Sequence, residues 1–219
     1  MDLMNEDHPE AKAPGRQRDR VARGQTIVAA AKDILSESGF ADFGINSIAR
    51  RAGCDKQLIY RYFDGLEGLA DVIGTDIADE LSAELEGFTR QEAPKTYAAW
   101  VERLAVGLLA LFRSNRIIQK IAAWELASPS SLTAIMAAAR AKRLNAWMVG
   151  LRGTLKPPEG LDTGALNAII IGAVQHLAMS ASAFQSQAGM QLETEADWQR
   201  AEAALLHIVR QTYGATDAS

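Results

Sequence analysis

Residues 45–63 read INSIARRAGCDKQLIYRYF and contain two short apolar patterns of helical period, one on each side of a glycine. The spacing predicts one helix over Ile45–Ala52 and a second over Lys56–Phe63. Gly53 can take the left-handed conformation that a tight turn requires, and Asp55 can cap the second helix. Two short helices joined in this way are typical of a helix-turn-helix unit.

The preceding segment supplies a third helix for this unit. Apolar side chains recur every three or four residues over Arg18–Ser38, and Gly39 can end that helix. From the two short helices, we expect five side chains to pack inward, namely Ile48, Ala49, Ala52, Ile59 and Phe63. The opposite face of the last helix would present Lys56, Gln57, Tyr60 and Arg61. Such side chains suit hydrogen bonding to base edges in the major groove, and Leu58 suits a thymine methyl group.

The rest of the chain repeats the helical pattern at greater length, interrupted by proline and glycine. Further helices are expected over Leu66–Phe88, Thr96–Ser114, Arg116–Ala127, Ser130–Leu155, Thr163–Gln187 and Glu195–Tyr213. No run of residues resembles a strand followed by a hairpin turn. The predicted fold class is all-α with about nine helices. It comprises a disordered tail over residues 1–16, a three-helix helix-turn-helix domain over residues 17–64 and a helical bundle over residues 65–219.

Composition narrows the class of protein. Of the 219 residues, 48% are hydrophobic, as in soluble globular proteins, and Cys54 is the single cysteine. One cysteine excludes an intramolecular disulfide and any multi-cysteine metal site. The start of the chain is polar rather than a secretory leader, and Asn167, Gln175 and His176 interrupt the apolar stretch over Ala165–Phe184. We therefore expect a cytoplasmic protein with no membrane partner, in which this stretch is a buried helix.

Charge is distributed unevenly along the chain. Residues 11–63 carry ten Lys and Arg against five acids, whereas residues 64–219 carry thirteen against eighteen. A basic first part on an acidic remainder favours a polyanionic partner for the first part alone.

Three segments carry a family resemblance: GFADFGI at 39–45, IARRAG at 48–53 and LIYRYF at 58–63. They closely resemble the N-terminal signature of the TetR/AcrR family of transcriptional regulators. The resemblance implies a homodimer that binds a double-stranded DNA operator, with a helical body for dimerisation and for a small-molecule effector. It implies that Lys56, Gln57, Leu58 and Arg61 face bases and that Tyr60 and Tyr62 contact phosphates. Asn46 would also lie near the DNA.

Two positions depart from the family pattern. Gly44 stands where the family has a capping hydroxyl residue that touches phosphate, and Leu66 followed by Glu67 replaces a lysine. Each departure removes a backbone contact, and an N-terminal arm with Arg16, Arg18 and Arg20 would compensate by reaching phosphates or the minor groove. A solvated, disordered arm that does not touch DNA is the alternative for these arginines. An alternative for Tyr60 and Tyr62 is that they are half-buried surface aromatics without a DNA contact. Cys54 is interpreted as a small hydrophobe, with a redox thiol as the alternative.

The function expected from these features is a repressor that binds a palindromic operator as a dimer and is released by an apolar or aromatic effector. The expected pocket residues come from several body helices: Trp100, Leu104, Trp124, Met136, Trp147, His176 and Met179. Thr163–Gln187 is apolar nearly all round, so we expect the last two helices of each chain to form a four-helix dimer interface. The competing hypothesis is a helical binding or interaction module without specific DNA binding. No enzyme motif is recognisable, so we expect no catalytic residues, no metal site and no cofactor.

Overall fold

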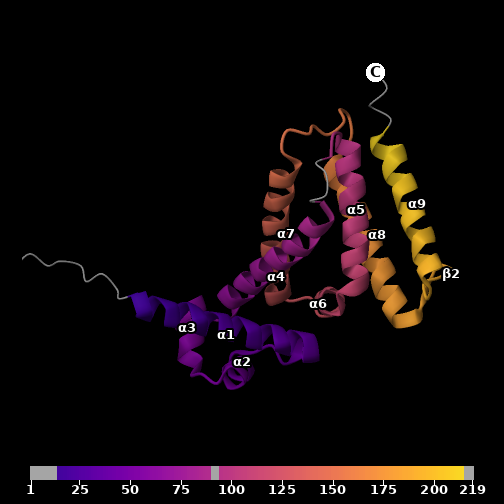
Figure 1. Ribbon diagram of the computed structural model, residues 1–219. Coiled ribbons are helices and arrows are strands. Elements are labelled where there is room, and N and C mark those ends of the chain that lie inside the picture. Colours follow the sequence, from indigo (N-terminus) through magenta and orange to yellow (C-terminus); the bar gives the residue numbers. More distant parts are fainter. Residues whose placement is uncertain (1–13, 90–93, 215–219) are drawn as a thin grey trace, which may run out of the picture. The chain divides into compact units, whose positions relative to one another are not determined.

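The computed structural model describes residues 14–89 and 94–214 (Figure 1). Within these ranges the chain forms nine α-helices, one short 3₁₀ turn (η1, Gly39–Ala41) and one small hairpin. The helices are α1 (Pro14–Ser38), α2 (Ile45–Ala52), α3 (Lys56–Phe63), α4 (Leu66–Thr89), α5 (Tyr97–Ser114), α6 (Arg116–Ala127), α7 (Ser131–Arg152), α8 (Thr163–Phe184) and α9 (Glu195–Tyr213). The all-α fold class is confirmed.

The chain divides between Leu69 and Ala70 into two compact units, here called the head (up to Leu69) and the body (from Ala70). The functional division after residue 64 stays a prediction. Helix α1 begins at Pro14, four residues earlier than predicted, because a proline ring presets the backbone angle of a first helical turn. Arg16, Arg18 and Arg20 therefore belong to a helix rather than to an extended arm. Residues 1–13 of the predicted tail lie outside the described residues.

The head is built around a small apolar core. Ile27 and Leu35 of α1, Ile48 of α2 and Ile59 of α3 are each at most 2% exposed. Gly53 adopts φ 63°, which turns the chain sharply between α2 and α3. This left-handed residue costs little as glycine, and it sets the two short helices at the angle that a helix-turn-helix requires.

The body is a bundle in which α5 packs against both α8 and α9, while α6 contacts α5, α7 and α8 (Figure 1). Each helix from α5 onward begins at a polar cap whose side chain accepts a backbone N–H, which stabilises the helix start. The capping residues are Thr96, Asn115, Ser130, Asp162 and Thr194. These caps explain why the expected and observed starts of the body helices differ by at most one residue.

The end of α8 was predicted wrongly. Gln185 takes φ 58° and ends the helix, and β1 (Ser186–Gln187) then pairs antiparallel with β2 (Met190–Gln191). Ala188 and Gly189 both have positive φ, as in the mirror-image turns that suit two-residue hairpins. This hairpin, which was not expected, leaves little trace in the sequence, because Ala-Gly is a weak turn signal and each strand has only two residues.

Helix α8 also differs from the buried helix that was expected. Within the described part of the chain it alone is long and apolar enough to cross a membrane by length and composition, a test that core helices of soluble proteins also pass. Only 22% of its apolar window is buried inside the chain. The single chain therefore leaves most of α8 uncovered.

Candidate nucleic-acid interface

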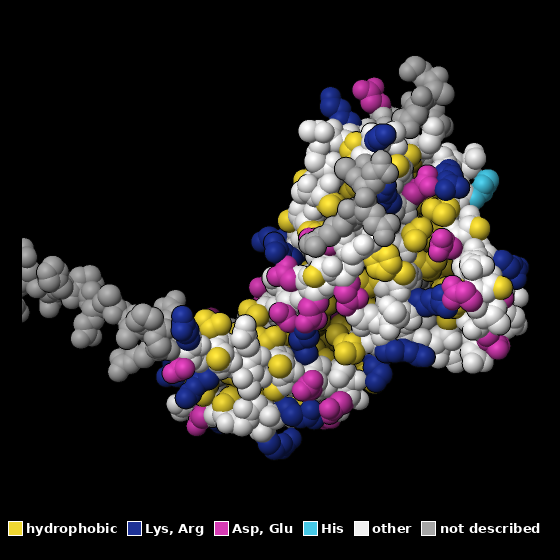
Figure 2. Space-filling view, in the orientation of Figure 1, with side chains coloured by type: hydrophobic (Ala, Val, Ile, Leu, Met, Phe, Trp, Pro, Cys, Tyr) yellow, Lys and Arg dark blue, Asp and Glu magenta, His cyan; other side chains and the backbone are white. Residues whose placement is uncertain are grey.

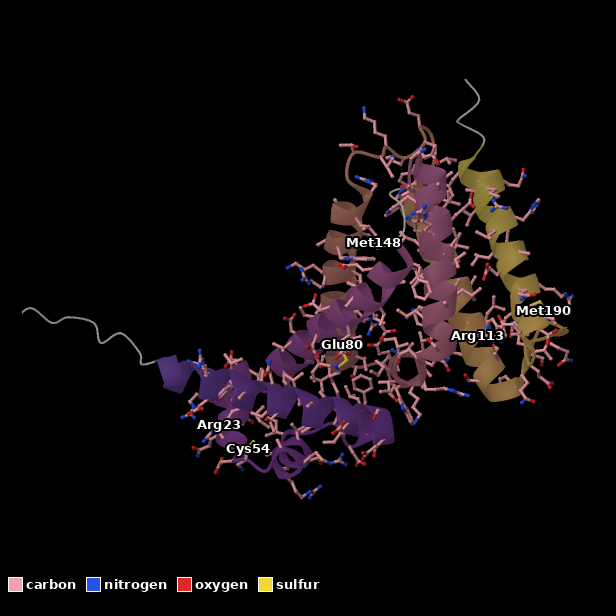
Figure 3. All side chains as sticks on the ribbon, in the orientation of Figure 1. Arg23, Cys54, Glu80, Arg113, Met148 and Met190 are labelled. Carbon is pink, nitrogen blue, oxygen red and sulfur yellow. The ribbon has the colours of Figure 1, made fainter. Side chains whose placement is uncertain are left out.

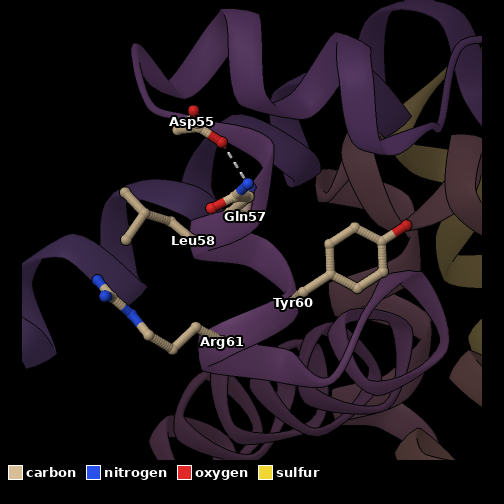
Figure 4. A pocket seen from close by; sticks show the side chains of 5 residues that line it. All are labelled: Asp55, Gln57, Leu58, Tyr60 and Arg61. Atoms are coloured by element: carbon tan, nitrogen blue, oxygen red, sulfur yellow. Dashed lines mark hydrogen bonds between the residues drawn. The ribbon is translucent and has the colours of Figure 1, made fainter.

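Helix α3 is fixed in rotation by one cap and one buried side chain. The Asp55 carboxylate accepts the backbone N–H of Gln57 at 2.7 Å, which anchors the first turn (Figure 4). Ile59 is fully buried against the rest of the head. With the inward face settled, the opposite face of α3 must point to solvent.

The exposed face of α3 carries the side chains that the sequence predicted there. Lys56, Gln57, Tyr60 and Arg61 are exposed, and Leu58 is half-buried. An open depression in the head is lined by Asp55, Gln57, Leu58, Tyr60 and Arg61 (Figure 4). The face offers four hydrogen-bonding side chains and one apolar contact within two helical turns, which is the size of surface that a major groove accepts.

Tyr62 lies at the edge of this face between two arginines. The guanidinium carbons of Arg20 and Arg61 lie 5.4 and 5.7 Å from its ring centroid. Both distances are within the range of cation–π attraction, so the aromatic ring helps to hold two positive charges together. The contact from Arg20 in α1 was missed, because sequence spacing does not show which α1 residue meets α3. Lys and Arg side chains stand out on the head surface among several acids (Figure 2).

Helix α2 is preceded by Gly44, where the family pattern has a capping hydroxyl residue. This residue is the N-cap in extended conformation, with no side-chain cap, and a Cβ there would meet no atom within 4 Å. Asn46 is exposed at the second position of the helix. A hydroxyl cap would fit sterically, so its absence removes a contact without distorting α2.

Two other polar groups of the head have structural explanations. Arg51 binds Glu37 with an Nη2–Oε2 distance of 2.6 Å, and this hydrogen bond lowers the pKa of Glu37. Arg51 thus ties α2 to α1.

Burial, followed by the charge of Asp55, raises the pKa of the Cys54 thiol. A raised pKa disfavours the thiolate, which argues against the redox alternative for Cys54.

The body contains a small apolar cavity of about 70 Å³ between α4, α5, α6, α7 and α8, and a second of about 30 Å³ between α5, α7 and α8. Of the predicted pocket residues, Leu104 and Trp147 line the first cavity, and Trp100 and Leu104 line the second. Met148 lines both and lies between α7 and α5 (Figure 3).

Trp124, Met136, His176 and Met179 line neither cavity, which corrects the predicted set. Trp124 is 37% exposed, and Met136 is fully buried where α7 meets α4. His176 is exposed, with its Nε2 3.4 Å from the Ser180 hydroxyl. Periodicity did not exclude His176 and Met179 because α8 is apolar on nearly every side.

The polar groups of the larger cavity are Arg140 and Gln175, which are not among the predicted pocket residues. Arg140 donates to both carboxylate oxygens of Glu125 at 2.7 and 2.6 Å, and both side chains are largely buried. Its spacing from Leu144, Trp147 and Met148 along α7 is the signal that could have placed Arg140 in the wall. Because Glu125 already neutralises it, Arg140 forms a closed ion pair in the wall.

Comparison with known proteins relates the helix-turn-helix of the head to a family of regulators. A family model described as bacterial regulatory proteins, tetR family, matches residues 27–73. A curated HTH-type transcriptional regulator from Mycobacterium tuberculosis is 27% identical over 192 residues, which cover 74% of this chain and 89% of the relative.

Solved structures share the fold over most of their length. A TetR-family regulator from Marinobacter aquaeolei has a TM-score of 0.56 at 15% identity, covering 88% of this chain and 97% of that one. FadR from Bacillus subtilis, solved with stearoyl-CoA, has a TM-score of 0.57 at 19% identity, covering 84% and 96%. With the helix-turn-helix geometry of α2 and α3, the family-model match over residues 27–73 and the curated relative support a DNA-binding transcriptional regulator of the TetR family, and the solved structures show the same fold.

Proposed function

We propose that this regulator is a cytoplasmic repressor that binds a palindromic operator as a homodimer and leaves it when a small effector enters the body. The observation that carries the proposal is the exposed polar face of α3, fixed by the Asp55 cap and by buried Ile59. Hydrogen-bonding side chains on a short helix of fixed orientation are what base recognition in the major groove requires.

In this proposal the head contacts DNA through α3 in the major groove. Lys56, Gln57 and Arg61 hydrogen-bond to base edges, and Leu58 contacts a thymine methyl group. Asn46, Tyr60 and Tyr62 contact phosphates, and the two arginines beside Tyr62 add positive charge there.

The uncovered face of α8 and α9 supports dimerisation. Ile169 and Phe184 of α8 are 69% and 77% exposed, and Ile208 of α9 is 56% exposed. Large apolar side chains gathered on two adjoining elements mark an interaction surface. A second copy of the chain covers such a surface by twofold symmetry, and two heads related in this way require a palindromic site.

The size of the cavities supports an effector that changes the body. Together they enclose about 100 Å³, whereas pockets for small molecules are typically 300–1,000 Å³. An effector must therefore move α5, α7 and α8 apart. Because the effector binds this opened body geometry more tightly, its binding free energy drives release from the DNA. FadR from Bacillus subtilis, a structural neighbour, was solved with stearoyl-CoA.

The test uses the purified full-length protein and the DNA upstream of its own gene. We expect footprinting to show two protected half-sites one helical turn apart, and compounds that raise the melting temperature to release that DNA. If the protein binds no DNA more tightly than a shuffled sequence at the same salt concentration, the alternative of a binding module without operator recognition is correct.

A further inference from the structure

Three buried polar atoms of the body have no hydrogen-bond partner among the described residues. They are Trp100 Nε1, Arg103 Nη1 and Arg152 Nε. Buried donors are paired in more than about nine cases in ten, because an unpaired one loses its hydration without compensation. All three groups are donors only, and two of them are cationic.

The three donors belong to one end of the bundle. Trp100 and Arg103 lie in adjacent turns at the start of α5, and Arg152 is the last residue of α7. Trp100 is 5% exposed and lines the smaller cavity together with Met148. Arg152 follows Met148 by four residues, so both side chains share one face of α7.

An apolar tract runs from this end into the body. Leu104, Leu108, Met148 and Ile171 line both cavities, so the two spaces adjoin across these side chains. The lining of α5 extends from Trp100 to Phe112, a rise of about 18 Å for a straight helix. At the larger cavity the charge of Arg140 is neutralised by Glu125. Trp100 lines the smaller cavity at one end of this tract, whereas Arg103 and Arg152 line neither cavity. Arg103 follows Trp100 by three residues on α5, and Arg152 follows the cavity-lining Met148 by four residues on α7.

We propose that the effector is an amphiphile with a linear apolar chain and a carboxylate head, and that the head accepts hydrogen bonds from Trp100, Arg103 and Arg152. A carboxylate is suited to this end because it accepts several bonds and its charge offsets the guanidinium groups. This inference rests on the proposed function, since it names the effector class of the same body site.

The test compares dodecanoate with 1-dodecanol and dodecylamine by titration calorimetry on the full-length protein, below the concentrations at which these compounds form micelles. We expect dodecanoate to bind at least about tenfold more tightly than dodecanol, since hydrogen bonds to a charged group exceed neutral ones. Arg103→Gln combined with Arg152→Gln should abolish this preference, and Trp100→Phe should reduce it. Arg143→Gln is the matched control, because Arg143 is exposed and pairs with Asp79. Circular dichroism establishes that each variant is folded.

Equal affinities for dodecanoate and dodecanol, binding of neither, or a preference that survives the double substitution would overturn the proposal. The proposed function is tested separately on operator DNA. If another compound releases the operator and no preference for a carboxylate is found, the proposed repressor function is supported and the head-group assignment is wrong. If dodecanoate binds through the arginines without releasing the operator, the carboxylate-binding site is supported, but the carboxylate is not the signal that releases DNA.

Discussion

Gly74 of α4 lies directly against the backbone carbonyl of Met136 in α7. A Cβ built on Gly74 would lie 2.2 Å from that carbonyl oxygen and 3.0 Å from the Ala139 Cβ. Both obstacles belong to one packed helix, so neither can rotate away as a flexible side chain would. The close crossing of α4 and α7 therefore depends on the absence of a side chain at residue 74.

Gly74→Ala is expected to lower the free energy of unfolding by about 1–3 kcal/mol, the usual cost of forcing extra volume into a packed contact. Gly87→Ala is the matched control on the same helix, since a Cβ there meets nothing within 4 Å. Helix propensity predicts a gain of up to about 1 kcal/mol for Gly87→Ala. Urea unfolding measures both variants, and equal stabilities would show that α4 and α7 are not in close contact.

Arg61→Ala is expected to cost about 1–3 kcal/mol in operator affinity if the guanidinium contacts a base bidentately. Stability should barely change, because Arg61 is exposed. Fluorescence anisotropy on operator DNA at one fixed salt concentration provides the measurement. Arg143→Ala removes an exposed arginine of the body and should bind like the wild type. If Arg61→Ala matches that control, α3 is not the reading helix.

Ile169→Glu on α8 is expected to convert a dimer into a monomer, because a carboxylate buried in an apolar interface has no partner. Ile169 is 69% exposed in the single chain, so the substitution should leave the fold intact. Leu126→Glu, on α6 and 76% exposed, replaces an equally exposed apolar residue outside α8 and α9. Light scattering should find a dimer for Leu126→Glu and a monomer for Ile169→Glu. A monomeric wild type would refute the interface itself.

The helix-turn-helix could be predicted to the residue because its determinants are local. Gly53 and Asp55 mark the turn and the cap, and the period of Ile48 and Ile59 indicates which faces are inward. Nothing in that geometry depends on distant parts of the chain. The observed bounds of α2 and α3 match the predicted ones for this reason.

The cavity could be predicted only in part, because its walls depend on how long helices rotate against one another. Leu104 and Trp147 lie on clear apolar stripes and line it, whereas His176 lies on a helix without a distinct polar face. The wall position of Arg140 depends on its pairing with Glu125, fifteen residues away on another helix. Such pairings between elements leave no local pattern in a single sequence.

The buried phenol of Tyr213 predicts a loss of stability at alkaline pH. Its hydroxyl donates to Asn167 Oδ1 at 3.0 Å, and burial, followed by the neighbouring Tyr97, raises its pKa to about 12. Because the ordinary value is 10.0, the folded state keeps this proton where the unfolded chain loses it. The stabilisation is therefore complete below about pH 10 and is lost as the pH rises to about 12, a change on the order of 2 kcal/mol.

Tyr213→Phe should be less stable than the wild type at neutral pH, by about 1 kcal/mol, because Asn167 loses its hydrogen-bond donor. It should then lose less stability between about pH 10 and 12, since it has no buried phenol to ionise. Tyr60→Phe, which alters an exposed tyrosine, should keep the wild-type alkaline loss because Tyr213 is intact. Urea unfolding over this pH range distinguishes the three proteins. Parallel curves for wild type and Tyr213→Phe would mean that Tyr213 ionises alike in the folded and unfolded states, so that its burial contributes nothing to the pH dependence of folding.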